Sequence, residues 1–515
     1  MPRKSSSKLH ELIHSLTKGE KRYYKLHASF VMKNSEENQY LRLFDILEKA
    51  KEYNEEKVMV ELIDVKEYFV IKNVLYSSIL KSLASLYSEK NSRMFTRSKL
   101  NEIDVLFRKG LYKQGHKLID QTKKKAEQNE QFETLLQLIN MEQKLLVSAM
   151  SFKSLKSYKE RIKVLMDETK SVLNIIENIK EYDTLLLPIA RLHFEGAQFQ
   201  QKKDLHYLEE LMKNDLLSSE QKTLSLRARL NYYYIWGMYH KLIFQKDKAL
   251  PFFEKRLKLF ENVDVFMQEL FSDYLFTLQL TSELAEESGK KELSTKVIAQ
   301  LTKMYSAQDD FAPEHQSNLF VYYYLAILEK HKQNHQFEEI IKFENDIQKG
   351  LVKYNAQINL GLQQELVYYI GYAYFATGKF IEAQKVLEQV LNTKSTGVKS
   401  DIFNISNILF LLCLFENGEF ELIKNTSKTW LKSLDEENVY FEIDSEIIQL
   451  VLRLIRSEKK FIRSHFYDFR DFLMSRQFDM QQLKIYKYFD AVAWLEGKIH
   501  GKTIFEHHLE LKQKK

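Results

Sequence analysis

The chain has 515 residues, of which 44% are hydrophobic and 29% are charged. This balance is ordinary for a folded protein and excludes a disordered chain. The formal net charge of +6 comes from 77 basic and 71 acidic residues, which indicates a mixed solvated surface rather than a nucleic-acid footprint.

Turn-forming residues and cysteine are scarce. With 4 Pro and 14 Gly, the chain is expected to form long helices joined by short connections rather than a β-rich fold. The only cysteine, Cys413, lies in the apolar run ILFLLCLF and is expected to be a buried small side chain. The N-terminus lacks the apolar core of a signal peptide, and the longest apolar run, 408–415, is far below the ~20 residues that span a bilayer. We therefore expect a cytoplasmic protein.

Residues 1–92 do not follow the pattern of the rest of the chain, and we predict a helical N-terminal segment there. Thr17 with Glu20 and Asp64 with Glu67 have the spacing of capping boxes, which mark helix starts. Helices are expected near residues 6–16, 18–31, 38–51, 55–63 and 66–88.

This N-terminal segment has two interpretations. Its successive helices, with turns at 52–54 and near Asp64, are compatible with a helix-turn-helix unit flanked by the basic stretches MPRKSSSK and SRMFTRSK. Alternatively, the segment only caps the first repeat of the following array. Capping is favoured, because the middle helix VMVELI is nearly all apolar and a recognition helix needs a polar, basic outer face.

A two-helix pattern repeats over residues 93–480. In VYYIGYAYFATGKFIEAQKVLEQV at 367–390, apolar residues recur at steps of three and four on both sides of the break TGKF. Gly378 suits the left-handed backbone that ends a helix, and Phe380 opens the next helix. Similar breaks recur at intervals of about 40–47 residues, which predicts a repeat architecture of about nine units. The break positions are Tyr112, Tyr158, Leu205, Lys246, Lys291, Phe337, Phe380, Phe420 and Phe461.

Two stretches resemble the tetratricopeptide-repeat pattern of small, aromatic, turn-glycine, aromatic and alanine residues. They comprise Gly371, Tyr374, Gly378, Phe380 and Ala383 in one stretch, and Gly237, Ala249 and Phe253 in the other. The resemblance implies an all-α fold, a right-handed α-solenoid of about nine long helical hairpins, with residues 481–515 as C-terminal capping helices. The run SLTKGEKRYYKL, followed by NQYLRLFDILEKAKEYNEEK, also resembles a family of uncharacterised bacterial helical-repeat proteins, which implies no activity.

Three tyrosine clusters, at 231–240, 320–327 and 367–375, lie on the first helix of their unit. In tetratricopeptide-like arrays the first helices line a concave face that holds peptides, and aromatic residues and arginine are enriched in binding hot spots. The alternative is that these tyrosines pack in the core between long helices. The partner-binding candidates are Tyr234, Met238, Tyr368, Tyr372, Arg453 and Arg456.

No motif in the sequence indicates catalysis, a cofactor or a metal. His331 and His335 lie one helical turn apart without a third ligand, so we expect a solvated helix end there, and His507 and His508 are expected at the surface. A glycine-rich phosphate loop and a nucleophile elbow are absent. We therefore expect no catalytic, cofactor-binding or metal-binding residues.

The leading hypothesis is a non-enzymatic scaffold that binds a protein or peptide segment in the concave groove of a helical-repeat array. The alternative is a transcriptional regulator with an N-terminal DNA-binding helical unit and a peptide- or protein-sensing repeat domain, for which a basic stripe on the helices at 55–63 and 66–88 would be diagnostic. An enzyme with a cleft that carries no sequence signature is the third possibility.

Overall fold

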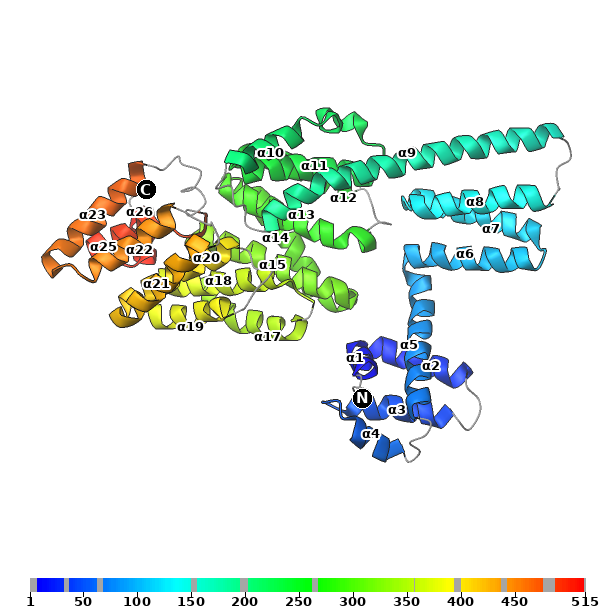
Figure 1. Cartoon of the computed structure of the whole chain (residues 1–515), viewed down its shortest axis with the longest axis horizontal. Coiled ribbons are helices and arrows are strands. Elements are labelled where there is room, and N and C mark those ends of the chain that lie inside the picture. The colour runs from blue at the N-terminus through cyan, green and yellow to red at the C-terminus, as the bar shows by residue number, and fades with distance from the viewer. Residues whose placement is uncertain are drawn as a thin grey trace. The chain divides into compact units, whose positions relative to one another are not determined.

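The structure is a computed structural model, and it describes residues 7–31, 37–62, 68–149, 155–194, 202–261, 267–355, 357–392, 400–436, 442–475 and 487–513 (Figure 1). Within these ranges there are 25 α-helices and no strand, which confirms the all-α prediction. The chain forms two compact units, residues 1–176 and 177–515, and the division falls inside α9 (Leu155–Phe194). This division does not coincide with the boundaries predicted after residues 92 and 480, which stay predictions.

Unit 1 begins with the helices expected for the N-terminal segment. Thr17 and Glu20 form a capping box, in which the Thr17 amide donates to Glu20 Oε2 at 2.6 Å and the Glu20 amide donates to Thr17 Oγ1 at 3.2 Å. The second expected box, at Asp64 and Glu67, lies outside the described residues. The helices are α1 (Lys8–Ser15), α2 (Lys18–Val31), α3 (Glu37–Lys49), α4 (Glu55–Leu62), α5 (Tyr68–Lys90), α6 (Ser92–Arg108), α7 (Tyr112–Gln128) and α8 (Phe132–Ala149).

Unit 2 contains two rows of helices. In the first row, α13, α15, α18, α20 and α22 contact one another in that order, and each helix of the second row contacts its first-row neighbours. The helices before the first row are α10 (Lys202–Met212), α11 (Leu226–Leu242) and α12 (Lys246–Glu261). The first row is α13 (Met267–Glu287), α15 (Pro313–Gln333), α18 (Leu360–Ala376), α20 (Ser400–Glu416) and α22 (Glu442–Leu454). The second row is α14 (Lys291–Ser306), α16 (Phe337–Lys342) with α17 (Glu344–Tyr354), α19 (Phe380–Leu391) and α21 (Phe420–Glu436).

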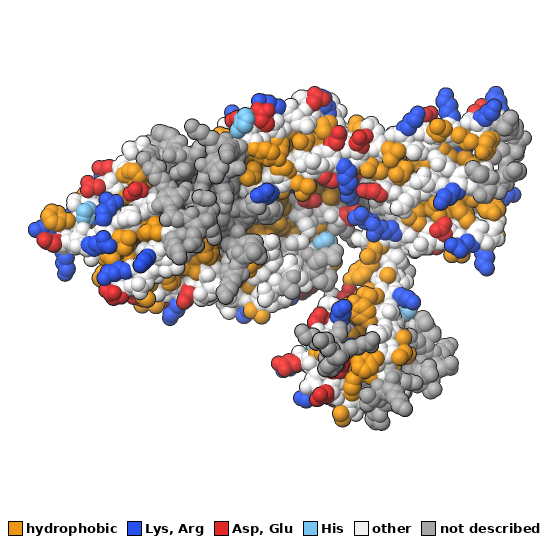
Figure 2. Space-filling model, viewed as in Figure 1, with side chains coloured by type: hydrophobic (Ala, Val, Ile, Leu, Met, Phe, Trp, Pro, Cys, Tyr) orange, Lys and Arg blue, Asp and Glu red, His pale blue; other side chains and the backbone are white. Residues whose placement is uncertain are grey.

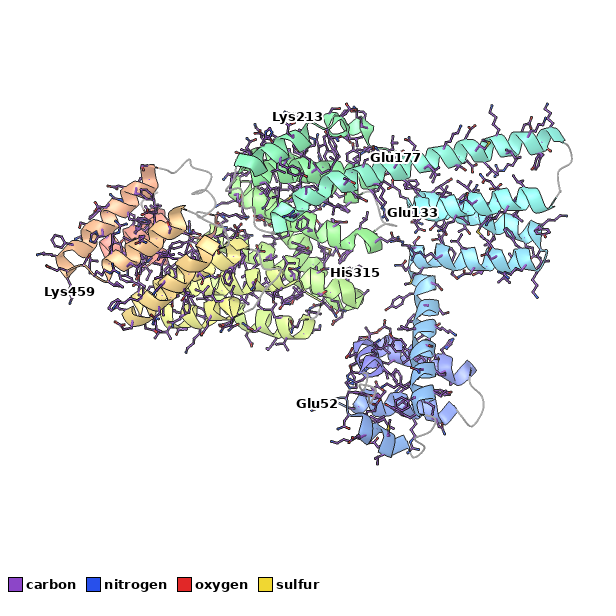
Figure 3. All side chains as sticks on the ribbon, viewed as in Figure 1. Glu52, Glu133, Glu177, Lys213, His315 and Lys459 are labelled. Atoms are coloured by element: carbon purple, nitrogen blue, oxygen red, sulfur yellow. The ribbon has the colours of Figure 1, made fainter. Side chains whose placement is uncertain are left out.

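Three further helices lie in the described residues at the end of unit 2. They are α23 (Lys459–Ser475), α25 (Ala491–His500) and α26 (Ile504–Gln513), and α25 contacts both of the others. Side chains fill the space between the helices of each unit (Figure 3). On the face shown in Figure 2, acidic and basic side chains are interspersed, as the composition predicts. None of the described helices is long and apolar enough to cross a membrane.

Seven helix connections in the described residues share one geometry. Each places a residue with positive φ two positions before the next helix, and the following amide donates to a carbonyl five residues back, as from Lys379 N to Tyr374 O at 2.9 Å. Four of these residues are glycines, including the expected Gly378, and three are not glycine. They are Gly110, Glu130, Phe244, Gly289, His335, Gly378 and Gly418, with φ between 49° and 77°.

The predicted break positions can be compared with these connections. Helices begin at Tyr112, Lys246, Lys291, Phe337, Phe380 and Phe420 as predicted, whereas α23 begins two residues before Phe461. The connections that precede Tyr158 and Leu205 fall at 150–154 and 195–201, outside the described residues.

The hairpin pattern does not continue between Tyr158 and Leu205. A helix, a turn and a second helix were expected there, but α9 runs through 40 residues as one helix. The sequence of α9 contains no glycine, the residue type found at four of the seven left-handed turns. The solenoid arrangement and the count of nine hairpins therefore stay predictions.

Candidate functional site

The structure places four of the six predicted partner-binding side chains in the core. Tyr234 is 5% exposed, Met238 and Tyr368 are 0% exposed, and Tyr372 is 2% exposed. The prediction that they form an exposed face is therefore wrong for the structure described. The two arginines differ, because Arg453 and Arg456 are exposed.

Tyr234 and Met238 are buried because α11 lies between other helices of unit 2. Both side chains belong to one apolar cluster with residues of α12 and α13, such as Phe253 and Leu280. The guanidinium of Arg256 lies 5.4 Å from the centre of the Tyr234 ring. The alternative interpretation, core packing, is confirmed for Tyr234.

Tyr368 and Tyr372 are covered by a segment from the far end of the chain. We call residues Lys487–Asp490 the KYFD segment. The Tyr368 hydroxyl donates to the carbonyl oxygen of Tyr488 at 2.6 Å, and the Asp490 amide donates to the Tyr372 hydroxyl at 3.3 Å. The two tyrosines therefore hold the main chain of a peptide stretch, and that stretch belongs to this chain.

A third contact to the main chain of the KYFD segment comes from α15. Lys332 Nζ donates to the carbonyl oxygen of Lys487 at 2.6 Å, and it also lies 3.1 Å from Glu329 Oε2. Glu329 is 1% exposed and accepts a hydrogen bond from the Tyr369 hydroxyl. We call the set Glu283, Glu329, Lys332, Tyr368 and Tyr372 the first-row surface.

The side chain of Lys487, which is 27% exposed, completes a charge network around the buried Glu283. Its Nζ lies 3.1 Å from Glu283 Oε1, and Glu283 also pairs with Lys241 of α11. Burial alone would raise the pKa of Glu283, but the two lysines outweigh burial and hold this pKa well below its ordinary value. Burial, followed by the neighbouring charge of Glu283, raises the pKa of Glu287. Glu283 is therefore the ionised carboxylate that faces Lys487.

The aromatic residues of the KYFD segment pack against aromatic residues of α18. Phe489 is fully buried, with its ring centre 5.8 Å from that of Phe375 and 6.4 Å from that of Tyr372. The ring of Tyr488 meets the ring of Tyr368 edge-on at 6.0 Å. Such edge-to-face arrangements are favourable for aromatic pairs.

The last residue of the segment connects to the two C-terminal helices. Asp490 Oδ1 accepts a hydrogen bond from Ala493 N and caps α25, and its Oδ2 lies 3.0 Å from His508 Nε2. The His508 ring stacks on the His335 ring at 3.6 Å. The expectation that His508 lies at the surface is therefore wrong, since its side chain is 12% exposed.

His335 is likewise not part of a solvated helix end. Burial, with smaller effects from His508 and Lys512, lowers its pKa to about 4, so the ring is neutral at neutral pH. His331 instead faces Gln336, at 2.9 Å.

No cluster of metal-ligating residues occurs in the part of the chain that is described. Cys413 is buried, as expected, and burial raises the pKa of its thiol.

The N-terminal helices lack the diagnostic feature of a DNA-binding unit in their described residues. On α4 the exposed Lys57 is accompanied by Glu56 and Glu61, and the exposed face of α5 carries Lys81 among mostly apolar and small residues. Lys72 of α5 is buried. The described outer faces of α4 and α5 therefore do not form a contiguous basic stripe.

The sequence pattern did not identify Glu283, Glu329, Lys332 or Lys487. The helical spacing did indicate that two of them are buried. Glu329 stands four residues after the buried Leu325, and Lys332 stands four residues after the buried Leu328, so both lie on the apolar face of the helix. Charged residues at core positions of a helix are costly to bury unless they are paired, so they point to a specific partner. Their partner lies more than a hundred residues away, at 487–490.

No protein-family model matches the chain, and neither a curated protein nor a solved structure matches it. The chemistry of its own residues therefore carries the functional argument.

Proposed function

We propose that this chain is a non-enzymatic interaction scaffold, a helical-repeat array of the tetratricopeptide kind whose first-row surface binds segments of other proteins. One observation carries the proposal. Three main-chain atoms of the KYFD segment are held by side chains of α15 and α18, at 2.6, 2.6 and 3.3 Å. Contacts to the main chain are the general means by which a surface holds a peptide of any sequence.

The first-row surface also has positions that select side chains. Glu283 receives a cation, and the rings of Tyr372 and Phe375 receive an aromatic ring. Arg453 and Arg456 lie exposed on and just after α22 and supply positive charge for acidic residues that flank a bound segment. The helices that carry this surface are packed, so little ordering cost falls on them, but a bound segment takes the place of the KYFD segment on Tyr368 and Tyr372.

The proposal is tested by panning a displayed library of short random peptides against the full-length chain. We expect enrichment of peptides whose binding weakens about tenfold in Tyr368→Phe, which removes a donor to a main-chain carbonyl and keeps the ring. Tyr374→Phe is the matched control on the same helix, because the Tyr374 hydroxyl instead donates to Glu344 at 2.5 Å. Equal effects of the two substitutions would contradict a role for the first-row surface.

A lack of any enriched peptide would contradict the scaffold proposal itself. The same preparations are to be tested with double-stranded DNA at several salt concentrations. Steeply salt-dependent DNA binding without peptide enrichment would favour the regulator, in which the N-terminal helices bind DNA.

A further inference from the structure

The main chain of the KYFD segment forms hydrogen bonds with side chains of the first-row surface, as the main chain of a bound peptide would. Its carbonyls at Lys487 and Tyr488 accept from side chains of unit 2, and its amide at Asp490 donates to another. None of these three contacts is a backbone-to-backbone bond of a helix. They depend on a peptide main chain being present, and they do not require that it belong to this chain.

The pairing of Lys487, whose side chain is 27% exposed, with the buried Glu283 is poorly explained by stability alone. A buried ion pair can often be replaced by apolar side chains of similar volume with no loss of stability, because desolvation offsets the attraction. At this position the chain instead places an ammonium beside Glu283, close to the carboxylate of Glu329. Opposed charges of this kind select one partner over others. A segment without the cation leaves Glu283 with one cation, Lys241, and the hydrogen bond from Gln279 Nε2 at 3.2 Å.

The segment occupies the same tyrosines that an incoming peptide would use. Tyr368 and Tyr372 are 0% and 2% exposed with the segment in place, so a second peptide cannot contact them at the same time. A covalently attached occupant competes at an effective concentration in about the millimolar range. The apparent affinity for an external peptide is then reduced by the fraction of molecules in which the site is occupied.

We propose that the KYFD segment is a displaceable internal ligand, and that the partner of this chain carries a segment with a basic residue followed by two aromatic residues. This inference rests on the proposed function and names the partner chemistry of the same site. The basic residue meets Glu283, the first aromatic ring meets Tyr368, and the second packs against Tyr372 and Phe375. The partner segment binds when the internal segment leaves.

The test uses a labelled synthetic peptide with the sequence IYKYFDAV, which reproduces residues 485–492, and fluorescence anisotropy with the full-length chain. Lys487→Ala with Tyr488→Ala weakens the internal segment, and we expect this double variant to bind the peptide at least about tenfold more tightly than the unaltered chain. A peptide with Glu in place of its Lys is the control, and it is expected not to bind either protein. Adding Tyr368→Phe to the double variant is expected to reverse most of the gain.

Equal binding of the peptide to the unaltered chain and the double variant overturns the inference. Absence of binding to both also overturns it, and if peptides from the random library still bind, the proposed function survives that failure. A second variant, Lys487→Met, keeps the length of the side chain and removes only the charge. It covers the case in which the double variant does not fold, and a gain in binding of the peptide is expected there as well.

Discussion

Replacing Glu283 by Gln tests whether the charge network at the first-row surface is as tightly coupled as its geometry indicates. The carboxylate of Glu283 pairs with Lys241 and lies 3.1 Å from Lys487 Nζ. Glu283 and Lys241 are each 8% exposed in their side chains, whereas Lys487 is 27% exposed. Glutamine keeps the shape of the side chain and removes the charge that both ammonium groups face.

The magnitude follows from which charge is left without its partner. Removing one member of a buried ion pair costs about 3–5 kcal/mol, because the remaining charge stays desolvated. The unpaired ammonium group of Lys241 destabilises the folded state by nearly this full amount. The ammonium group of Lys487 destabilises it less, because solvent reaches that side chain. We therefore expect Glu283→Gln to lower the free energy of unfolding of unit 2 by about 3–5 kcal/mol. Adding Lys241→Met is expected to recover part of this loss, because it removes the unpaired charge.

The chain offers a probe that reports on unit 2 alone. Its three tryptophans, Trp236, Trp430 and Trp494, all lie in residues 177–515, so tryptophan fluorescence during urea unfolding follows that unit. The matched control is Glu421→Gln, where an 88% exposed carboxylate pairs with Lys424 at 2.9 Å. That exposed pair is worth about 0.3–0.5 kcal/mol.

The destabilisation caused by Glu283→Gln is expected to depend on pH. The pKa of Glu283 is lowered in the folded state, so its contribution to stability is present above the ordinary pKa of a glutamate and is lost as the pH falls through the folded value. Glu283→Gln should therefore lose less stability than the unaltered chain on acidification below about pH 4. A destabilisation at neutral pH no larger than that of Glu421→Gln would refute the reasoning.

Three further outcomes are expected. In unit 1, Glu142 is 1% exposed and pairs with Lys123 at 2.7 Å. Glu142→Gln should therefore lower the free energy of unfolding of unit 1, followed by circular dichroism, by about 3–5 kcal/mol and leave the tryptophan-monitored unfolding of unit 2 unchanged. Gly418 has a positive φ of 76°, so Gly418→Ala should lower the free energy of unfolding in urea by about 1–2 kcal/mol. Gly19 lies within the helix α2, so Gly19→Ala should raise the free energy of unfolding by up to about 1 kcal/mol. Because the pKa of His335 is lowered in the folded state, its contribution to stability is present above about pH 6.5 and is lost as the pH falls toward 4. In His335→Asn, the free energy of unfolding should therefore change less between these two pH values.

The helix breaks were predictable because turn chemistry is local. Gly378 and Gly418 take the left-handed backbone that their residue type favours, and the helices that follow begin where the sequence indicated. The turn at Glu130 was missed because glutamate gives no signal for that backbone. The turns at Phe244 and His335 also lack glycine, but the helices that follow them begin at the predicted Lys246 and Phe337. The starts of these helices were therefore predictable where a glycine or the spacing of the repeat marks the turn.

The exposure of the tyrosines was not predictable from the spacing of apolar residues within one helix. The partners of Tyr368 and Tyr372 stand 120 and 118 residues further along the chain. One feature of the sequence did point to burial, because LVYYIGYA at 366–373 has no polar face and all eight residues are buried. A helix that is apolar on every side is covered on every side, and the KYFD segment supplies part of the cover over Tyr368 and Tyr372.

The contacts at the KYFD segment divide into two kinds with different consequences. The bonds from Lys332 and Tyr368 to carbonyl oxygens recognise any main chain, so they set how strongly a segment is held. The charge of Glu283 recognises only a cation at one position, and an apolar residue there leaves a buried carboxylate with one partner fewer. In the proposed interaction, strength and selectivity come from separate atoms. A substitution at Tyr368 is then expected to weaken all bound segments, while one at Glu283 is expected to change which segments are bound.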